Sequence, residues 1–180
     1  TDRGPRFQAG YVDHNALDRA WRFDTHARID RVSSEVLGGL TFPRDEHGWR
    51  YGLEGKNNQQ DIQGEERTDW SVTGARTYTV EQYESQLALQ VVAEERAIES
   101  GPEDNRKATF LSQAWTWNRI DDPLAPRDGF AVRFQAGGAG AQLGSDRSFG
   151  RLTARGSYLQ PVGGFGTLML RLETGAVIAG

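Results

Sequence analysis

A two-residue periodicity of apolar and polar side chains recurs along the chain and limits the folds that it can adopt. The clearest run lies between residues 21 and 31, where Trp21, Phe23, Ala27 and Ile29 fall at alternate positions with Thr25 among them. The positions between them carry the charged or polar residues Arg22, Asp24, His26, Arg28 and Asp30. Successive side chains of a β-strand point to opposite faces, so this period predicts strands with one apolar and one polar face.

The same alternation returns further along the chain. Longer runs place on one face Tyr83, Leu87, Leu89, Val91 and Ala93, then Leu152, Ala154, Gly156 and Tyr158, and finally Leu168, Leu170 and Leu172. Shorter runs occur at 7–11, 49–53 and 130–134. The stretch 91–100 contains good helix formers. It continues the alternation that precedes it, however, and we predict a strand there.

Polar or Gly/Pro-rich breaks separate these runs and divide the chain into about ten strands. The predicted breaks are 13–19, 32–34, 43–48, 60–67, 81–83, 99–106, 121–129, 137–147 and 161–165. Most of the predicted strands have about 10–15 residues, against the 5–6 that are typical of soluble sheets. The sequence therefore predicts an all-β, antiparallel fold in which residues 1–180 form a single β-barrel segment.

Two kinds of barrel fit long, one-sided strands. A soluble barrel is apolar inside and polar outside, whereas a membrane barrel is apolar outside and polar within. No run reaches the roughly 18 apolar residues of a membrane helix. The mean hydropathy of −0.65 is compatible with a transmembrane barrel, whose strands are apolar only at alternate positions. The polar positions carry both charge signs, which favours a water-filled lumen and hence the membrane barrel.

Composition excludes several other classes of protein. The chain has no cysteine, so it has neither disulfides nor thiolate metal sites. Its net charge of −4 gives no basic footprint for nucleic acid.

Five tryptophans lie near predicted strand ends or in mid-strand, and some of them suit a membrane interface. These are Trp21, Trp49, Trp70, Trp115 and Trp117.

No constellation of residues predicts chemistry. The histidines, His14, His26 and His47, have no G-x-S-x-G elbow or βαβ unit beside them. The glycine-rich stretch 137–144 does not fit G-x-G-x-x-G and is predicted to be a hairpin loop. The acidic residues at 121–128 lack the spacing of a calcium loop. We therefore expect no enzyme activity, and we assign no catalytic, cofactor-binding or metal-ligating residue and no cofactor.

Segment 107–175 carries a resemblance to a known family. It contains, in order, a Trp-bearing strand, a D-P-x-x-P-x-x-G turn and a strand that enters the Gly-rich loop closed by Ser145 and Asp146. A strand ending in Q-P-V-G and a strand with R-L-E-T-G follow. This order resembles the barrel of the outer-membrane assembly and translocation superfamily, also called the bacterial surface antigen family. Within it, the chain looks most like TamA-like outer-membrane subunits of translocation and assembly modules.

The resemblance implies a location in the bacterial outer membrane and a structural role in inserting or exporting other outer-membrane proteins. It implies contacts with membrane lipid, with client proteins, and with an inner-membrane or periplasmic partner of the parent protein. The segment would correspond to strands two to eleven of a larger barrel, without its periplasmic domains. A porin or usher-type channel and a soluble barrel that binds a small apolar ligand remain as alternatives.

Three structural expectations follow. First, one surface, facing lipid, should carry Trp21, Phe23, Ala27, Ile29, Leu87, Leu89, Val91, Leu152, Ala154, Leu168, Leu170 and Leu172. Arg76 falls among apolar positions, so either its strand faces the other way or Arg76 lies near an interface, since a charge at mid-depth costs ~2–4 kcal/mol.

The second expectation concerns the connections, which should alternate between the two sides of the membrane. Those at 13–19, 43–48, 81–83, 121–129 and 161–165 should be periplasmic, and those at 32–34, 60–67, 99–106 and 137–147 should be outside. The third expectation is an open sheet, in which residues 5–12 and 166–178 form no regular ladder with each other.

Overall fold

The computed structural model describes residues 5–62, 65–98, 104–122 and 124–179, and within them it contains ten strands and one short 3-10 turn. The strands are β1 (Phe7–Ala16), β2 (Trp21–Ile29), β3 (Ser33–Thr41), β4 (Trp49–Ile62), β5 (Glu65–Val80), β6 (Tyr83–Ile98), β7 (Asp104–Ile120), β8 (Gly129–Ala139), β9 (Phe149–Val162) and β10 (Gly166–Ala179). The turn is η1 (Ala141–Leu143). Among these residues no helix is long and apolar enough to cross a membrane.

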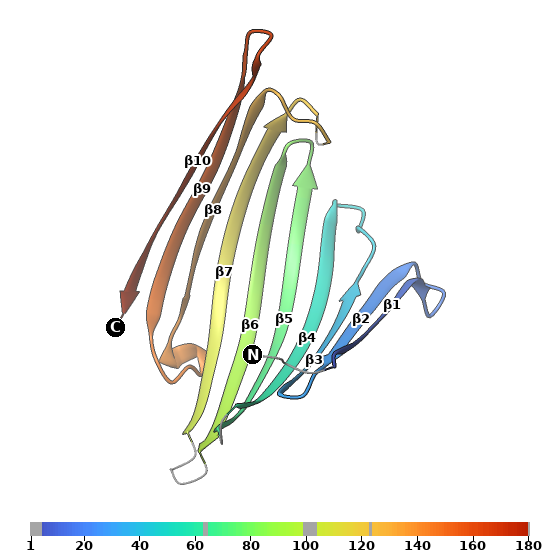
Figure 1. Cartoon of the computed structure of the whole chain (residues 1–180), viewed down its shortest axis with the longest axis vertical. Coiled ribbons are helices and arrows are strands. Elements are labelled where there is room, and N and C mark those ends of the chain that lie inside the picture. Colours follow the sequence, from blue (N-terminus) through green and yellow to red (C-terminus); the bar gives the residue numbers. More distant parts are fainter. Residues whose placement is uncertain (1–4, 63–64, 99–103, 123, 180) are drawn as a thin grey trace.

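All ten strands form one antiparallel sheet in which each strand pairs with its neighbours in chain order (Figure 1). The predicted number of strands and their order are confirmed. The stretch 91–98 is part of strand β6, as predicted, while 99 and 100 lie outside the described residues. The described part shows no ladder between β1 and β10, so the expectation of an open sheet is also confirmed there.

Most of the predicted breaks were drawn too wide. Strand β1 continues to Ala16, and β8 continues to Ala139, so residues 137–139 of the predicted hairpin loop 137–144 are strand. Two further breaks lie in polar segments. Strand β4 continues to Ile62 and β5 begins at Glu65, inside the predicted break 60–67, and β7 begins at Asp104 inside the break 99–106. The alternation fades in these segments because both faces of the strands are polar there. Backbone pairing nevertheless continues, as between Gln60 and Arg67. Hydrogen bonding between main chains does not depend on the side-chain pattern, which explains the difference.

The cross-strand register brings the predicted apolar positions onto one face of the sheet. Residues that are directly opposite in a ladder point to the same side. A continuous row of such pairs links Phe23, Leu40, Leu53, Gly74 and Leu89. Further pairs carry this face through β7 and β8 to β9 and β10. All twelve residues predicted to share a surface lie on this face.

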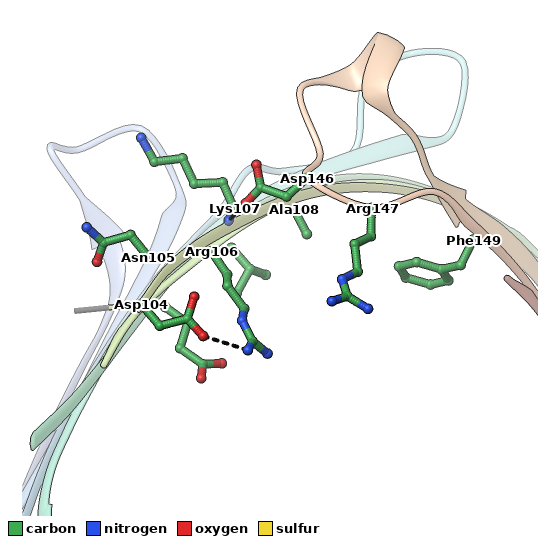
Figure 2. A pocket seen from close by; sticks show the side chains of 10 residues that line it. Asp104, Asn105, Arg106, Lys107, Ala108, Asp146, Arg147 and Phe149 are labelled. Atoms are coloured by element: carbon green, nitrogen blue, oxygen red, sulfur yellow. Dashed lines mark hydrogen bonds and ion pairs between the residues drawn. The ribbon is translucent and has the colours of Figure 1, made fainter. Parts of the chain in front are cut away.

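The sheet is curved, and the apolar face is its convex side. In Figure 2, which looks along the sheet near the start of β7, Asp104 and Arg106 project into the curve while Lys107 lies outside it. The even-numbered positions of β7 belong to the polar face, because they pair with the polar positions Glu94 and Gln90 of β6. The concave face is therefore the charged one, and the apolar face is turned outward.

The sheet forms a single layer without a hydrophobic core of its own. Among the described residues only four apolar side chains are buried: Ala93, Ala114, Ala139 and Leu159. Large apolar residues such as Leu89, Leu152 and Leu172 stay exposed on the convex face, at 45%, 56% and 71%. A soluble barrel would turn these residues inward, so this arrangement contradicts the alternative of a soluble ligand-binding barrel.

The loop between β8 and β9 supports the first residues of β7. Strand β8 ends opposite Phe110, which leaves residues 104–109 of β7 without a neighbour on that side. The Ser145 hydroxyl accepts the Thr109 N–H at 2.7 Å and donates to the Thr109 carbonyl at 3.0 Å. Asp146 accepts the Lys107 N–H through its carboxylate at 2.6 Å, and its own N–H donates to the Lys107 carbonyl at 3.0 Å. Two loop residues thus take the place of a missing strand.

Candidate membrane-facing surface and charged lumen

Aromatic residues form a belt near one end of the convex face. They lie towards the turns at one end of the sheet, which connect β1 to β2, β3 to β4, β5 to β6, β7 to β8 and β9 to β10, and several pack against each other. Trp49 contacts Tyr78 with ring centroids 5.1 Å apart, and Tyr83 contacts Trp117 at 5.4 Å. The belt consists of Trp21, Trp49, Tyr78, Tyr83, Trp117, Phe130 and Tyr158. Trp and Tyr gather in this way at membrane interfaces.

The belt crosses the strands at the slope that tilted strands require. Directly opposite residues can be followed from strand to strand across the sheet. By this register, Trp49 on β4 is level with Phe134 on β8 and Ala154 on β9. The belt residues of those strands, Phe130 and Tyr158, lie four residues closer to the turns. Four residues at about 3.4 Å, over five strand spacings of about 4.8 Å, give a slope of about 30°. Barrel strands tilt by roughly 35–45°, so the belt runs nearly level around the wall.

The apolar band above the belt has the height of a bilayer core. On β5 it extends from Tyr78 to Trp70, eight residues away, which is about 27 Å along the strand and about 22 Å after correction for tilt. Outer-membrane barrels carry an apolar band about 25 Å tall. Beyond Trp70 the convex positions become polar, with Thr68 and Glu66 on β5. Strands β4 to β7 therefore extend past the band.

Arg76 lies on the convex face and at the belt, so the second of its two predicted explanations is correct. It pairs with Tyr51 and Leu87 in the same register as the other convex residues, which excludes a reversed strand. Its guanidinium carbon lies 4.2 Å from the centroid of the Trp49 ring. The charge thus sits over an aromatic face next to the interface, where its desolvation is small.

The concave face is lined by ion pairs across and along the strands. Lys56 of β4 binds Glu35 of β3 at 2.7 Å, and Arg96 of β6 binds Glu65 of β5 at 2.7 Å. Arg67 of β5 contacts both its neighbour Asp69 and Glu94 of β6, at 3.0 and 3.1 Å. The predicted charged lining is confirmed. Such pairs hold side chains along the lumen wall, although each exposed pair adds little stability.

A hollow of about 570 Å³ lies on the concave side near the end of β6 and the start of β7 (Figure 2). Its walls include Val92, Ala108 and Phe149, and Phe149 stacks on Phe110 with centroids 5.7 Å apart. Figure 2 shows Arg106 and Arg147 at its edge, with Arg106 bonded to Asp104. Four apolar side chains thus lie together among the charged residues of the concave face, and the alternation pattern gave no sign of this cluster.

The histidine and acidic residues that were considered for chemistry make contacts that serve the fold. His26 lies on the charged face of β2 beside Asp24 and Arg28. Asp121 is occupied by its own turn, where its carboxylate accepts the N–H groups of Arg127 and Asp128 at 3.0 and 3.1 Å. These bonds favour the charged form and hold the pKa of Asp121 below its usual value. The described residues contain no cluster of three metal-ligating side chains.

These features define a class of protein: a curved antiparallel wall with a lipid-type surface outside and a charged lumen surface inside. A sequence model of the Omp85 superfamily domain matches residues 2–180. The chain belongs to the Omp85 superfamily, and its place is the bacterial outer membrane. The predicted family and location are confirmed.

Solved structures support the fold. The crystal structure of BamA from Haemophilus ducreyi lacking POTRA domains 1–3 superposes with a TM-score of 0.81 at 14% sequence identity. The similarity covers 99% of this chain and 39% of the BamA chain, so the chain spans less than half of that relative. The comparison with curated protein sequences found no significant match.

Proposed function

We propose that this chain is part of the barrel wall of an outer-membrane protein that inserts or exports other outer-membrane proteins. The observation that carries the proposal is the superfamily match over residues 2–180, together with an outward apolar band that suits lipid. The role is structural: the wall holds the barrel in the bilayer and lines its lumen, and no covalent step is assigned to it. Its partners are membrane lipid and client outer-membrane proteins.

The finer assignment within the superfamily is to TamA-like subunits, on the resemblance of segment 107–175. Such a subunit acts with an inner-membrane or periplasmic partner. Cross-linking of the full-length protein in cells, followed by identification of the trapped proteins, tests this assignment. Recovery of an inner-membrane protein of the same module supports it, whereas recovery of outer-membrane assembly lipoproteins alone contradicts it.

Depletion of the full-length protein in cells tests the general proposal. Folded outer-membrane proteins resist unfolding by detergent at low temperature, so their assembly is measured as the shift between folded and unfolded gel bands. We expect depletion to lower the folded fraction of a subset of outer-membrane proteins. A porin or usher-type channel predicts a different result: ion conductance by the purified protein, with the folded fraction unchanged after depletion.

A further inference from the structure

Charge is distributed unevenly over the concave face. Strands β2 to β7 carry seven basic and eight acidic residues on this face, and most of them form ion pairs. Strands β8 to β10 carry four arginines and one carboxylate. The four are Arg133 on β8, Arg151 and Arg155 on β9, and Arg171 on β10, and the carboxylate is Glu173. We call these four residues the arginine strip.

The register places the charges of the strip next to one another. Arg133 and Arg155 are directly opposite in the β8–β9 ladder, and two like charges in such a pair destabilise it by repulsion. Arg155 binds Glu173 at 2.8 Å, and Arg133 donates to the Thr116 hydroxyl at 3.2 Å. Arg171 opposes Ser157, one level closer to the turn. A single carboxylate thus faces three guanidinium groups within one region of the wall.

The strip is an accessible trough rather than a packed cluster. Arg133, Arg155 and Arg171 line a hollow of about 360 Å³ together with Thr116, Ala131 and Ser157. Towards Arg151 the concave positions include Thr153, Gly137 and Gly175, which carry a short side chain or none, beside the longer Gln135 and Val177. The side chain of Arg155 is 63% exposed and that of Glu173 is 64% exposed. The exposed guanidinium group of Arg155 and the hollow beside Arg133 and Arg171 can therefore meet a ligand.

The length and depth of the strip decide what kind of ligand fits. The levels of Arg171, Arg155 and Arg151 are separated by two and four residues, which is about 7 and about 13 Å. A single phosphate cannot span about 20 Å. Lipid head groups are also excluded, because the strip lies on the concave face and Arg155 is three residues inside the belt residue Tyr158. An extended polypeptide repeats its side chains on one side every ~7 Å, which matches these spacings.

We infer that the arginine strip binds an acidic, extended segment of a partner polypeptide inside the lumen. Carboxylates at positions 1, 3 and 7 of such a segment would lie opposite Arg171, the Arg133–Arg155 pair and Arg151. Guanidinium groups bind carboxylates with short, charge-assisted bonds. The segment would also relieve the repulsion between Arg133 and Arg155. This inference rests on the outer-membrane barrel and not on the proposed assembly role, because a channel could use the same strip.

The test uses the full-length protein in detergent micelles and a fluorescent eight-residue peptide with Asp at positions 1, 3 and 7. Its matched probe has Asn at these positions. We expect the Asp peptide to bind at low salt, to weaken as salt rises, and to cross-link to a photoreactive group placed at Thr153. The double variant Arg133→Gln/Arg171→Gln should bind about tenfold more weakly. Arg50→Gln removes one positive charge from the concave face at β4, outside the strip, and should leave binding unchanged.

Three results would overturn the inference. Equal binding of the Asp and Asn peptides would show that the carboxylates do not determine binding. Full competition by inorganic phosphate at the peptide's own concentration would indicate a small-anion site. A cross-link from position 153 that forms only within the protein itself, with no binding of added peptide, would show that the strip is filled by its own chain.

Discussion

At position 129 the backbone adopts a conformation that only glycine tolerates. Gly129 begins β8 with φ at +124°, and a Cβ there would overlap the carbonyl oxygen of Arg119 in the neighbouring strand. We predict that Gly129→Ala destabilises the full-length protein by about 2 kcal/mol or more, measured as a lower urea midpoint in detergent. Gly164→Ala is the matched control, since no atom lies within 4 Å of its added Cβ. Equal midpoints for the two variants would contradict this explanation.

The turn before Gly129 should also respond to acid. The bonds from Arg127 and Asp128 lower the pKa of Asp121 in the folded state, so the unfolded chain takes up the proton first as pH falls. The stabilisation is therefore fully present above the unfolded pKa of about 4, and it is lost as pH falls through the lower folded pKa. We predict that wild type exceeds Asp121→Asn in urea midpoint at pH 7 and that this difference shrinks below pH 4. A difference in urea midpoint that stays constant with pH would show that ionisation of the Asp121 carboxylate is not the source of the stabilisation.

At the scale of strands, the alternation predicted most of the fold because each strand meets two different surroundings. Where Leu87 and Leu89 alternate with Gln86 and Gln90, the pattern gave both the strand and its faces. It failed where both surroundings are aqueous, as in the outer ends of β4 and β5. The partners of ion pairs such as Arg67–Glu94 depend on the register between strands, which the pattern does not specify. The arginine strip could not be predicted for the same reason, because its residues are brought together by the register of three strands.

The loop between β8 and β9 offers a test at the same scale. Ser145 is 6% exposed and completes the hydrogen bonding of Thr109 in β7. We predict that Ser145→Ala costs about 1–2 kcal/mol, because it leaves a partly buried backbone N–H without its acceptor. Faster hydrogen exchange at the Thr109 amide is the measurement. Ser148→Ala is the control, since the exposed Ser148 hydroxyl makes only a 3.4 Å bond to the Ala141 N–H.

At the scale of the whole molecule, the two faces of the sheet should meet different solvents. These 180 residues contain no cysteine, so a single cysteine introduced here can be labelled once any cysteine elsewhere in the full-length protein is replaced. We predict that a spin label at Leu89, on the convex face, is accessible to oxygen and shielded from a polar relaxant, because it contacts lipid. A label at Gln90, the next residue on the concave face, should show the opposite pattern. Reversal of the two patterns would place the apolar face towards the lumen.

The orientation of the wall in the membrane follows from its two ends. Strands β4 to β7 extend past the apolar band at one end, whereas the aromatic belt lies close to the turns at the other. Outer-membrane barrels have short periplasmic turns and longer extensions outside the cell. We therefore predict that the turn at 121–128 lies in the periplasm and the loop at 140–148 outside, as expected from the alternation of connections in the sequence.

Labelling of intact cells that carry the full-length protein checks this orientation. A membrane-impermeant thiol reagent should modify Gln142→Cys, in the loop after β8, before the cells are broken. It should modify Leu124→Cys, at an exposed position of the turn after β7, only after the outer membrane is opened. Because antiparallel hairpins reverse at every connection, these two sites fix the sides of all the others. Modification of Leu124→Cys on intact cells would invert the whole assignment, including the depth at which a polypeptide would meet the arginine strip.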